Sequence, residues 1–315
     1  MKPASLFAVA AAPLALFAAN PAFAQDQHSG HMAAPASAPA PASVATPATG
    51  KGPALWMVAD DDTSIYLFGT VHVLPQGIEW YDTTIASAFD SAGTIVTEIP
   101  LDAQSEGEMA QLTRDKGMLP AGTTLRSLLN AEQITAYTAA MGKIGVPVEA
   151  FDPLKPWLAG LTLSIMPLMQ QGYDPNSGVE KVLLAKAEGK EKGALETAAF
   201  QLGIFDGMTQ EAQVAFMMEA ATGIDEIRPM LDSMVAEWSE GDAEGLAAIM
   251  NEGMSDPAVA EALLYTRNAN WAEWIDVRLD TPGTVFVAVG AGHLAGARSV
   301  QDYLAQKGIA VTRVR

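Results

Sequence analysis

The stretch "YLFGTVHVLP" (residues 66–75) determines how the rest of the chain is read. An apolar run typical of a buried strand leads to a glycine, and a histidine stands three residues after that glycine. The same order occurs near the other end of the chain, in "VFVAVGAGHLAG" (residues 285–296). Two of the four histidines, His72 and His293, therefore share a Gly-x-x-His pattern after an apolar run.

Apolar runs at both ends of the chain predict the strands of one sheet. The first two runs are separated by a cluster of aspartates, which predicts a β-hairpin. The third run, "GTIVTEIP", predicts a buried strand that ends at Glu98. The expected strands are "ALWMVAD" (54–60), "TSIYLFG" (63–69), "GTIVTEIP" (93–100), "GTVFVAVG" (283–290) and "IAVTRV" (309–314).

The middle of the chain is predicted to be mostly helical, because apolar residues recur there at three- and four-residue spacing. One exception is "KGALET" (192–197), where a short strand is expected to place Glu196 at its end. Helices are also predicted over 82–92 and over 293–308, the second ending at Gly308. We therefore predict an α/β fold, with a mixed sheet assembled from N- and C-terminal strands and a large, mostly helical middle insertion at about 101–281.

The first 53 residues are predicted to lie outside the folded domain. Residues 1–24 combine a lysine, a short apolar run and the triplet Ala-Phe-Ala, which indicates a signal peptide cleaved near Ala24. Residues 25–53 are rich in Ala, Pro and Ser and predict a disordered linker. Its histidines, His28 and His31, are expected to be solvated, with a weak metal-loading site as the alternative. Residues 54–315 form the predicted domain of an exported protein, periplasmic or secreted.

Composition excludes several classes of protein. A formal net charge of −19 and the lack of a basic stripe argue against nucleic-acid binding, which requires clustered Lys and Arg. The most apolar later stretch, "LAGLTLSIMPLM" (158–169), is too short and too interrupted to cross a bilayer, so no transmembrane segment is expected. The chain has no cysteine, so its stability cannot depend on disulfides.

Three ionisable residues are predicted at strand ends, where active sites of open α/β sheets collect. His72, Glu98 and His293 could satisfy one another there through a divalent metal, with two imidazoles and a carboxylate as ligands. Gly69, Gly290 and Gly292 would let the backbone turn and approach a ligand. His293 is also expected to open a helix, whose dipole would keep the ring neutral. The alternative is that both histidines are satisfied core residues.

Further candidates follow from the other polar residues. Glu196 could be a general base, another ligand or a solvated side chain. Arg267 and Asn268 are predicted on a helix, where Arg267 could stabilise an oxyanion or simply pair with a carboxylate. Glu180 begins a predicted helix, where the helix dipole favours a carboxylate. "GAGHLA" (290–295) also fits a dinucleotide fingerprint, but the βαβ unit and acidic residue that should follow it are missing.

The chain resembles the TraB/GumN family, which is related to the Tiki proteins. The resemblance covers about residues 54–315 and rests on a set of motifs in this order: "LWMVADDDTSIYLFGTVHVLP", "YDPNSGVE", "ALETAAFQL", "RNANWAEWI" and "VFVAVGAGHLAG". It implies a metal site at His72, Glu98 and His293, with Arg267 and Asn268 in the Arg-Asn helix motif and Glu196 in the Leu-Glu-Thr segment. The Tiki relatives are described as metalloproteases that use manganese or cobalt, GumN members are linked to polysaccharide production, and TraB members to pheromone control.

These observations lead to one functional expectation and two alternatives. We expect a metal-dependent hydrolase, metallopeptidase-like, that uses Mn, Co or Zn and acts on a peptide or small-molecule substrate. In this mechanism Glu196 takes a proton from water and Arg267 stabilises the oxyanion. Asn268 is the third expected catalytic residue. The first alternative is a non-catalytic binder of a metal, haem or peptide signal, or an accessory factor in polysaccharide production. The second is a helical scaffold with incidental histidines. The sequence leaves the oligomeric state open.

Overall fold

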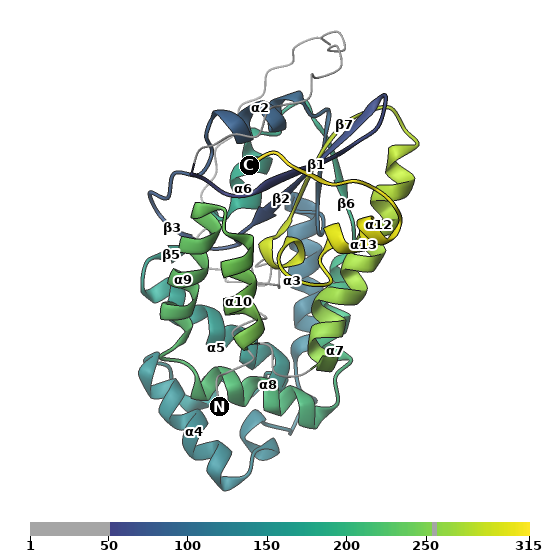
Figure 1. The fold of residues 1–315 in the computed structure, drawn as a ribbon. Helices are drawn as coiled ribbons and strands as arrows, with labels where there is room; N and C mark the ends of the chain where they lie inside the picture. The colour runs from purple at the N-terminus through teal and green to yellow at the C-terminus, as the bar shows by residue number, and fades with distance from the viewer. Residues whose placement is uncertain (1–50, 254–256) are drawn as a thin grey trace, which may run out of the picture.

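The computed structural model describes residues 51–253 and 257–315. The predicted signal peptide, His28, His31 and nearly all of the predicted linker lie outside the described residues. The fold is a mixed α/β arrangement in which a six-stranded sheet occupies one end of the molecule and a group of helices the other (Figure 1). This confirms the predicted fold class.

The sheet is assembled from strands far apart in the sequence. Its order is β6-β4-β7-β2-β1-β8, and the four strands from β6 to β2 run parallel. The predicted hairpin is confirmed, because β1 pairs antiparallel with β2; β8 then adds antiparallel to β1. The main strands are β1 Leu55–Ala59, β2 Thr63–Thr70, β4 Thr94–Thr97, β6 Glu191–Ala194, β7 Gly283–Gly290 and β8 Thr312–Arg313. A separate two-stranded sheet pairs β3 Leu74–Pro75 with β5 Tyr173–Asp174.

Most of the chain between β4 and β7 is helical, as predicted, with β5 and β6 as short interruptions. Helices α4, α5 and α8 pack together at the end of the molecule away from the sheet (Figure 1). The helices are α2 Thr83–Ser91, α3 Ala103–Gly117, α4 Ala131–Lys143, α5 Pro156–Gln170, α6 Val179–Lys186, α7 Ala198–Asp206, α8 Gln210–Thr222, α9 Ile227–Glu240, α10 Ala243–Gly253, α11 Pro257–Ala260, α12 Thr266–Leu279 and α13 Val300–Gln306. Short 3-10 turns are η2 Leu125–Leu128, η3 Val148–Phe151, η4 Pro175–Ser177 and η6 Ala291–Leu294, and η5 Glu261–Tyr265 is a π-helical turn.

Helices cover both faces of the sheet, which explains why its central strands are mostly apolar and buried. On β7, Val285 and Val287 pack in a cluster that includes Trp271 of α12 and Leu304 of α13. Phe286 belongs to the larger cluster on the opposite face, together with side chains of α2, α6 and α9. The sheet therefore forms the middle layer of the domain and holds its strand ends in fixed relative positions.

The prediction of one helix over 293–308 is wrong. His293 lies in the four-residue turn η6, and α13 begins only after Ser299, whose hydroxyl caps it. The intervening residues include Gly296 (φ 67°) and Arg298 (φ 59°), both in the left-handed region, which interrupts a helix.

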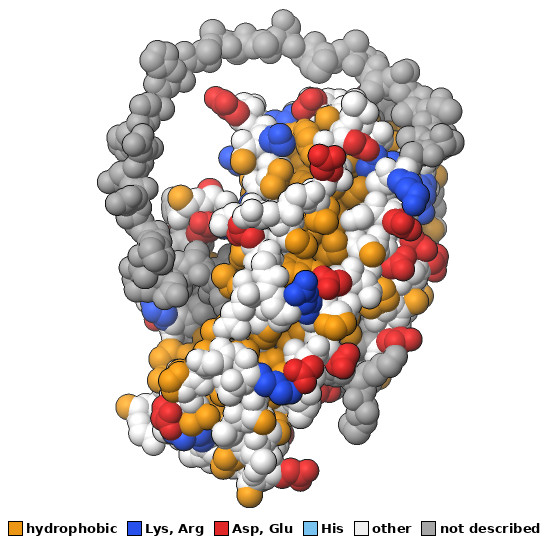
Figure 2. Space-filling model, turned by 90° about the vertical axis from the view of Figure 1, so that its left-hand side faces the viewer, with side chains coloured by type: hydrophobic (Ala, Val, Ile, Leu, Met, Phe, Trp, Pro, Cys, Tyr) orange, Lys and Arg blue, Asp and Glu red, His pale blue; other side chains and the backbone are white. Residues whose placement is uncertain are grey.

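Two surface findings bear on the predicted partners. Within residues 51–253 and 257–315, no helix is long and apolar enough to cross a membrane. On the face shown in Figure 2, basic side chains are scattered among acidic ones and form no stripe.

Candidate functional site at the carboxyl edge of the sheet

The parallel strands carry four predicted site residues to one edge of the sheet. β2 and β7 pair in register up to Thr70 and Gly290, so the two Gly-x-x-His segments leave the sheet side by side. Glu98 follows β4 directly, and Glu196 lies two residues beyond β6. The backbone N–H of Glu196 donates to the carbonyl of Glu98 at 2.8 Å, which extends the pairing of these strands to the two carboxylates.

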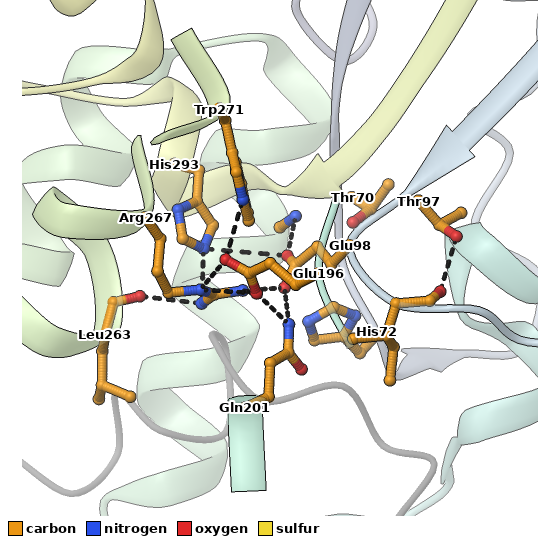
Figure 3. Close-up of polar contacts among 12 residues, drawn as sticks. Thr70, His72, Thr97, Glu98, Glu196, Gln201, Leu263, Arg267, Trp271 and His293 are labelled. Carbon is orange, nitrogen blue, oxygen red and sulfur yellow. Dashed lines mark hydrogen bonds and ion pairs between the residues drawn. The ribbon is translucent and has the colours of Figure 1, made fainter. Parts of the chain in front are cut away.

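Arg267 of α12 lies at the centre of this group and uses all five of its N–H donors. Its Nε donates to both carboxylate oxygens of Glu196 (2.9 and 3.1 Å), and its Nη2 to Oε2 of Glu98 (2.5 Å) and Oε2 of Glu196 (2.9 Å). Nη1 donates to the carbonyl of Leu263 (2.9 Å) and to Nε2 of His293 (3.1 Å). In Figure 3, His293 and His72 lie on opposite sides of this cluster. The burial that would lower the pKa of the guanidinium is outweighed by the two glutamates, which raise it.

Asn268 fixes which nitrogen of His293 carries the proton. The Asn268 amide donates from Nδ2 to the carbonyl of Arg298 (2.8 Å), which leaves Oδ1 to face Nδ1 of His293 at 2.5 Å. Nδ1 must therefore be the protonated nitrogen, and Nε2 presents a lone pair to Arg267. Burial first, then the charges of Arg267 and His72, hold the pKa of His293 well below 6.5. Burial therefore favours the neutral ring, and His293 lies in the short turn η6 and not at the start of a helix whose dipole could act on it.

His72 is held by a second carboxylate, that of Glu180 at the start of α6. Nδ1 of His72 lies 2.6 Å from Oε1 of Glu180, which also accepts the hydroxyl proton of Thr70. Burial alone would lower the pKa of His72, but the charge and hydrogen bond of Glu180 raise it on balance. For Glu180 the directions are reversed. Burial alone would raise its pKa, but the charge and hydrogen bond of His72 lower it on balance. Glu180 therefore orients His72. This role was not predicted from the position of Glu180 at the start of a helix.

Two buried polar atoms of the cluster have no hydrogen-bond partner among the described residues: Nε2 of His72 and Oε1 of Gln201. Gln201 of α7 donates through Nε2 to Glu98 (3.0 Å) and to Glu196 (2.9 Å), and so links the two carboxylates. Gln201 was not among the residues predicted from the sequence, although it follows Glu196 by five residues within "ALETAAFQL". Native proteins rarely leave such atoms unpaired, so each indicates a position where a ligand could bind.

The motif glycines let chain segments pack closely against one another. A Cβ at Gly69 would lie 3.0 Å from the backbone of Ala291, and one at Gly292 would lie 2.0 Å from the methyl group of Met250. The N–H of Gly290 donates to Oε1 of Glu98 at 2.7 Å. Packing within the chain therefore favours glycine at positions 69 and 292. The hydrogen bond of Gly290 is made by its backbone and does not itself require a glycine. Gly178 was also missed: a Cβ there would lie 2.1 Å from the carbonyl oxygen of His72.

The donor chemistry of the cluster fits a divalent metal, although Arg267 already forms hydrogen bonds with Glu98 and His293. Both imidazoles have Nδ1 fixed by another side chain, as metal-ligating histidines usually do, and Nε2 of His72 is free. Glu98, Glu180 and Glu196 carry three negative charges, against one guanidinium and one imidazole that can carry a proton, so a further cation is accommodated electrostatically. In the described residues, however, no three His, Cys, Asp or Glu side chains already stand together as a metal-binding group.

A small cavity borders His72. It is lined by Thr70, His72 and Gly292 on the side of the sheet and by Leu231, Met234 and Leu246 of α9 and α10. Its volume of about 20 Å³ leaves room for one water molecule.

The family model described as "TraB/PrgY/gumN family" matches residues 54–313. The chain belongs to this family. It is also similar to an uncharacterized protein of Treponema pallidum (strain Nichols), with 22% identity over 270 residues that cover 80% of each chain. No solved structure matches the chain significantly. The resemblance stated from the motifs is thereby confirmed.

The low pKa of His293 predicts a loss of stability on acidification. The unfolded chain takes up a proton at this residue near pH 6.5, whereas the folded ring does so only at lower pH, so the free energy of unfolding should fall as pH drops from 6.5 to 5. The slope from this group reaches about 1.4 kcal/mol per pH unit. The contribution of His72, whose pKa is raised, is constant in this range and is lost only as pH rises above 6.5. Urea unfolding of the metal-free protein and of His293→Gln at several pH values measures the difference, and equal slopes would contradict the prediction.

Proposed function

We propose that the chain is an exported metal-dependent hydrolase, most simply a peptidase, in which His72, Glu98 and His293 hold the ion. The observation that carries the proposal is the unpartnered, buried Nε2 of His72, whose other nitrogen is fixed by Glu180. Such an atom points to a cation that the chain itself does not supply. The export part of the proposal rests on residues 1–24 of the sequence.

Each side chain has a role that follows from its contacts. A divalent ion, when bound, supplies a Lewis acid that polarises a substrate carbonyl. Glu180 and Asn268 keep the lone pairs of the two imidazoles directed into the site. Arg267 supplies a fixed positive charge for an oxyanion. Glu196 remains the candidate base, and must exchange a hydrogen bond from Arg267, Trp271 or Gln201 for one from water before it can take a proton.

The metal site is tested by the uptake of Mn²⁺, Co²⁺ and Zn²⁺ by the mature protein and by the double variant His72→Ala/His293→Ala. We expect one equivalent in the parent and at least a 100-fold weaker affinity in the double variant, because two of three ligands are removed. Circular dichroism establishes that the variant is folded. Equal uptake by both proteins would show that the metal binds elsewhere, and no uptake by either would remove the metal from the proposal.

The burial of the site favours a second candidate, a non-catalytic binder. The side chains of His72, Glu98, Arg267 and His293 are at most 5% exposed, and the adjacent cavity has room for only one water. A single metal ion fits such a site without any opening, whereas a peptide, as substrate or as signal, requires the site to open. Incubation of the metal-loaded protein with a peptide library and mass spectrometry of the products separates the two: cleavage supports the hydrolase, and stoichiometric binding without new fragments supports the binder.

A further inference from the structure

We propose that Arg267 is a built-in cation that competes with the metal for the same ligand atoms, so that metal uptake requires its guanidinium to release His293 and Glu98. This inference rests on the proposed metal site and goes beyond it, because it assigns to the chain's own arginine the control of metal affinity.

The contacts of Arg267 carry the inference. Two of its nitrogens donate hydrogen bonds to atoms that a metal would need. Nη1 donates to Nε2 of His293 at 3.1 Å, and Nη2 donates to Oε2 of Glu98 at 2.5 Å. A nitrogen lone pair that accepts a hydrogen bond cannot bind a metal at the same time, and a cation placed at a carboxylate repels a second one. The neutral state of His293 suits either partner.

The charge of the cluster explains why a cation must be present when the metal is not. Glu98 and Glu196 are buried side by side and linked through Gln201. Two buried carboxylates with no positive charge between them would strongly destabilise the fold. The guanidinium offsets one of these two negative charges and donates hydrogen bonds to both carboxylates, and a metal would take over part of this task.

The remaining contacts show how the exchange can occur without loss of the arginine from the site. Its other bonds go to Glu196 and to the carbonyl of Leu263, and its guanidinium lies 4.9 Å from the ring of Trp271. None of these three groups is a proposed ligand. Arg267 can therefore stay anchored on Glu196 while it releases His293 and Glu98, which frees two N–H donors at the edge of the site.

The experiment compares Mn²⁺ binding by the parent, Arg267→Met and Arg267→Lys, using calorimetry and the Mn²⁺ paramagnetic resonance signal. Methionine fills a similar volume without charge or N–H donors, and lysine keeps the charge but offers three donors in place of five. We expect the dissociation constant to fall at least tenfold in Arg267→Met and by a smaller factor in Arg267→Lys. Added Mn²⁺ should also raise the unfolding temperature of Arg267→Met by more than that of the parent.

Arg126→Met is the matched control, because Arg126 also pairs with two carboxylates, Asp152 and Glu149, on other elements of the fold. Its Mn²⁺ affinity should equal that of the parent. If Arg267→Met does not fold, Arg267→Lys decides the question.

The outcomes separate the inference from the proposed function. Tighter binding by the folded Arg267 variants, with or without measurable binding by the parent, supports the competition. One equivalent in the parent with equal or weaker affinity in both variants overturns it and leaves the metal site standing. No binding of Mn²⁺, Co²⁺ or Zn²⁺ by the parent or either variant overturns the metal site and the competition together.

Discussion

Replacement of Glu98 by glutamine is expected to lower the free energy of unfolding of the metal-free protein by about 3–5 kcal/mol, the usual effect of removing one partner of a buried ion pair. Oε1 of Glu98 accepts the N–H of Gly290, and Oε2 accepts N–H groups of Arg267 and Gln201. Glutamine has one acceptor oxygen. Whichever way its amide is turned, an NH₂ group faces a donor, and the positive charge of Arg267 loses a counter-ion.

Urea denaturation of Glu98→Gln and of the control Glu149→Gln measures this effect. Glu149 also pairs with an arginine, but its side chain is 64% exposed, so its replacement should change stability by less than about 0.5 kcal/mol. Similar small losses in both variants would mean that the cluster at the sheet edge is not a buried, mutually dependent network.

Gly178→Ala is expected to displace the backbone of His72 and to cost about 1–3 kcal/mol of stability, as forced overpacking does. The added Cβ would lie 2.1 Å from the carbonyl oxygen of His72 and 3.0 Å from that of Pro175, and backbone atoms cannot rotate away as a side chain can. The φ of Gly178 is −57°, so the effect is steric and does not come from a left-handed conformation. Because the same segment carries Glu180, the displacement should also disturb the contact that orients His72.

The matched control is Gly142→Ala, because the Cβ that would be added to Gly142 in α4 has no atom within 4 Å apart from its chain neighbours and the backbone of its own helix. Alanine is the better helix former, so this variant should be unchanged or more stable by up to about 1 kcal/mol. Urea denaturation gives both stabilities, and imidazole NMR reports whether the His72 resonances shift. A Gly178→Ala protein with unchanged stability and an unshifted His72 would contradict the close contact.

The local order of residues was sufficient to predict the main strands and the convergence of the site. Apolar runs bounded by turns and glycines identified β1, β2, β4 and β7, because strands that pack in the interior of a sheet are mostly apolar. The position of His72, Glu98 and His293 just after such runs placed them at one sheet edge, since the carboxyl ends of parallel strands lie together. The prediction of one helix at 293–308 was wrong, because it gave the apolar pattern more weight than the glycines, whose conformations interrupt a helix.

The sequence by itself determined the family, the two-ended sheet and the residues that gather at its edge, because these follow from hydrophobic pattern and motif order along the chain. Only the tertiary structure decided which atom meets which. Arg267 and Glu98 are 169 residues apart in the chain, and Thr70 and Glu180 are 110 apart. The roles of Arg267 as the central cation, of Glu180 as the support of His72 and of Gln201 as the bridge between carboxylates depend on side-chain directions fixed by packing between distant elements. Such contacts leave no periodicity in the sequence from which they could be predicted.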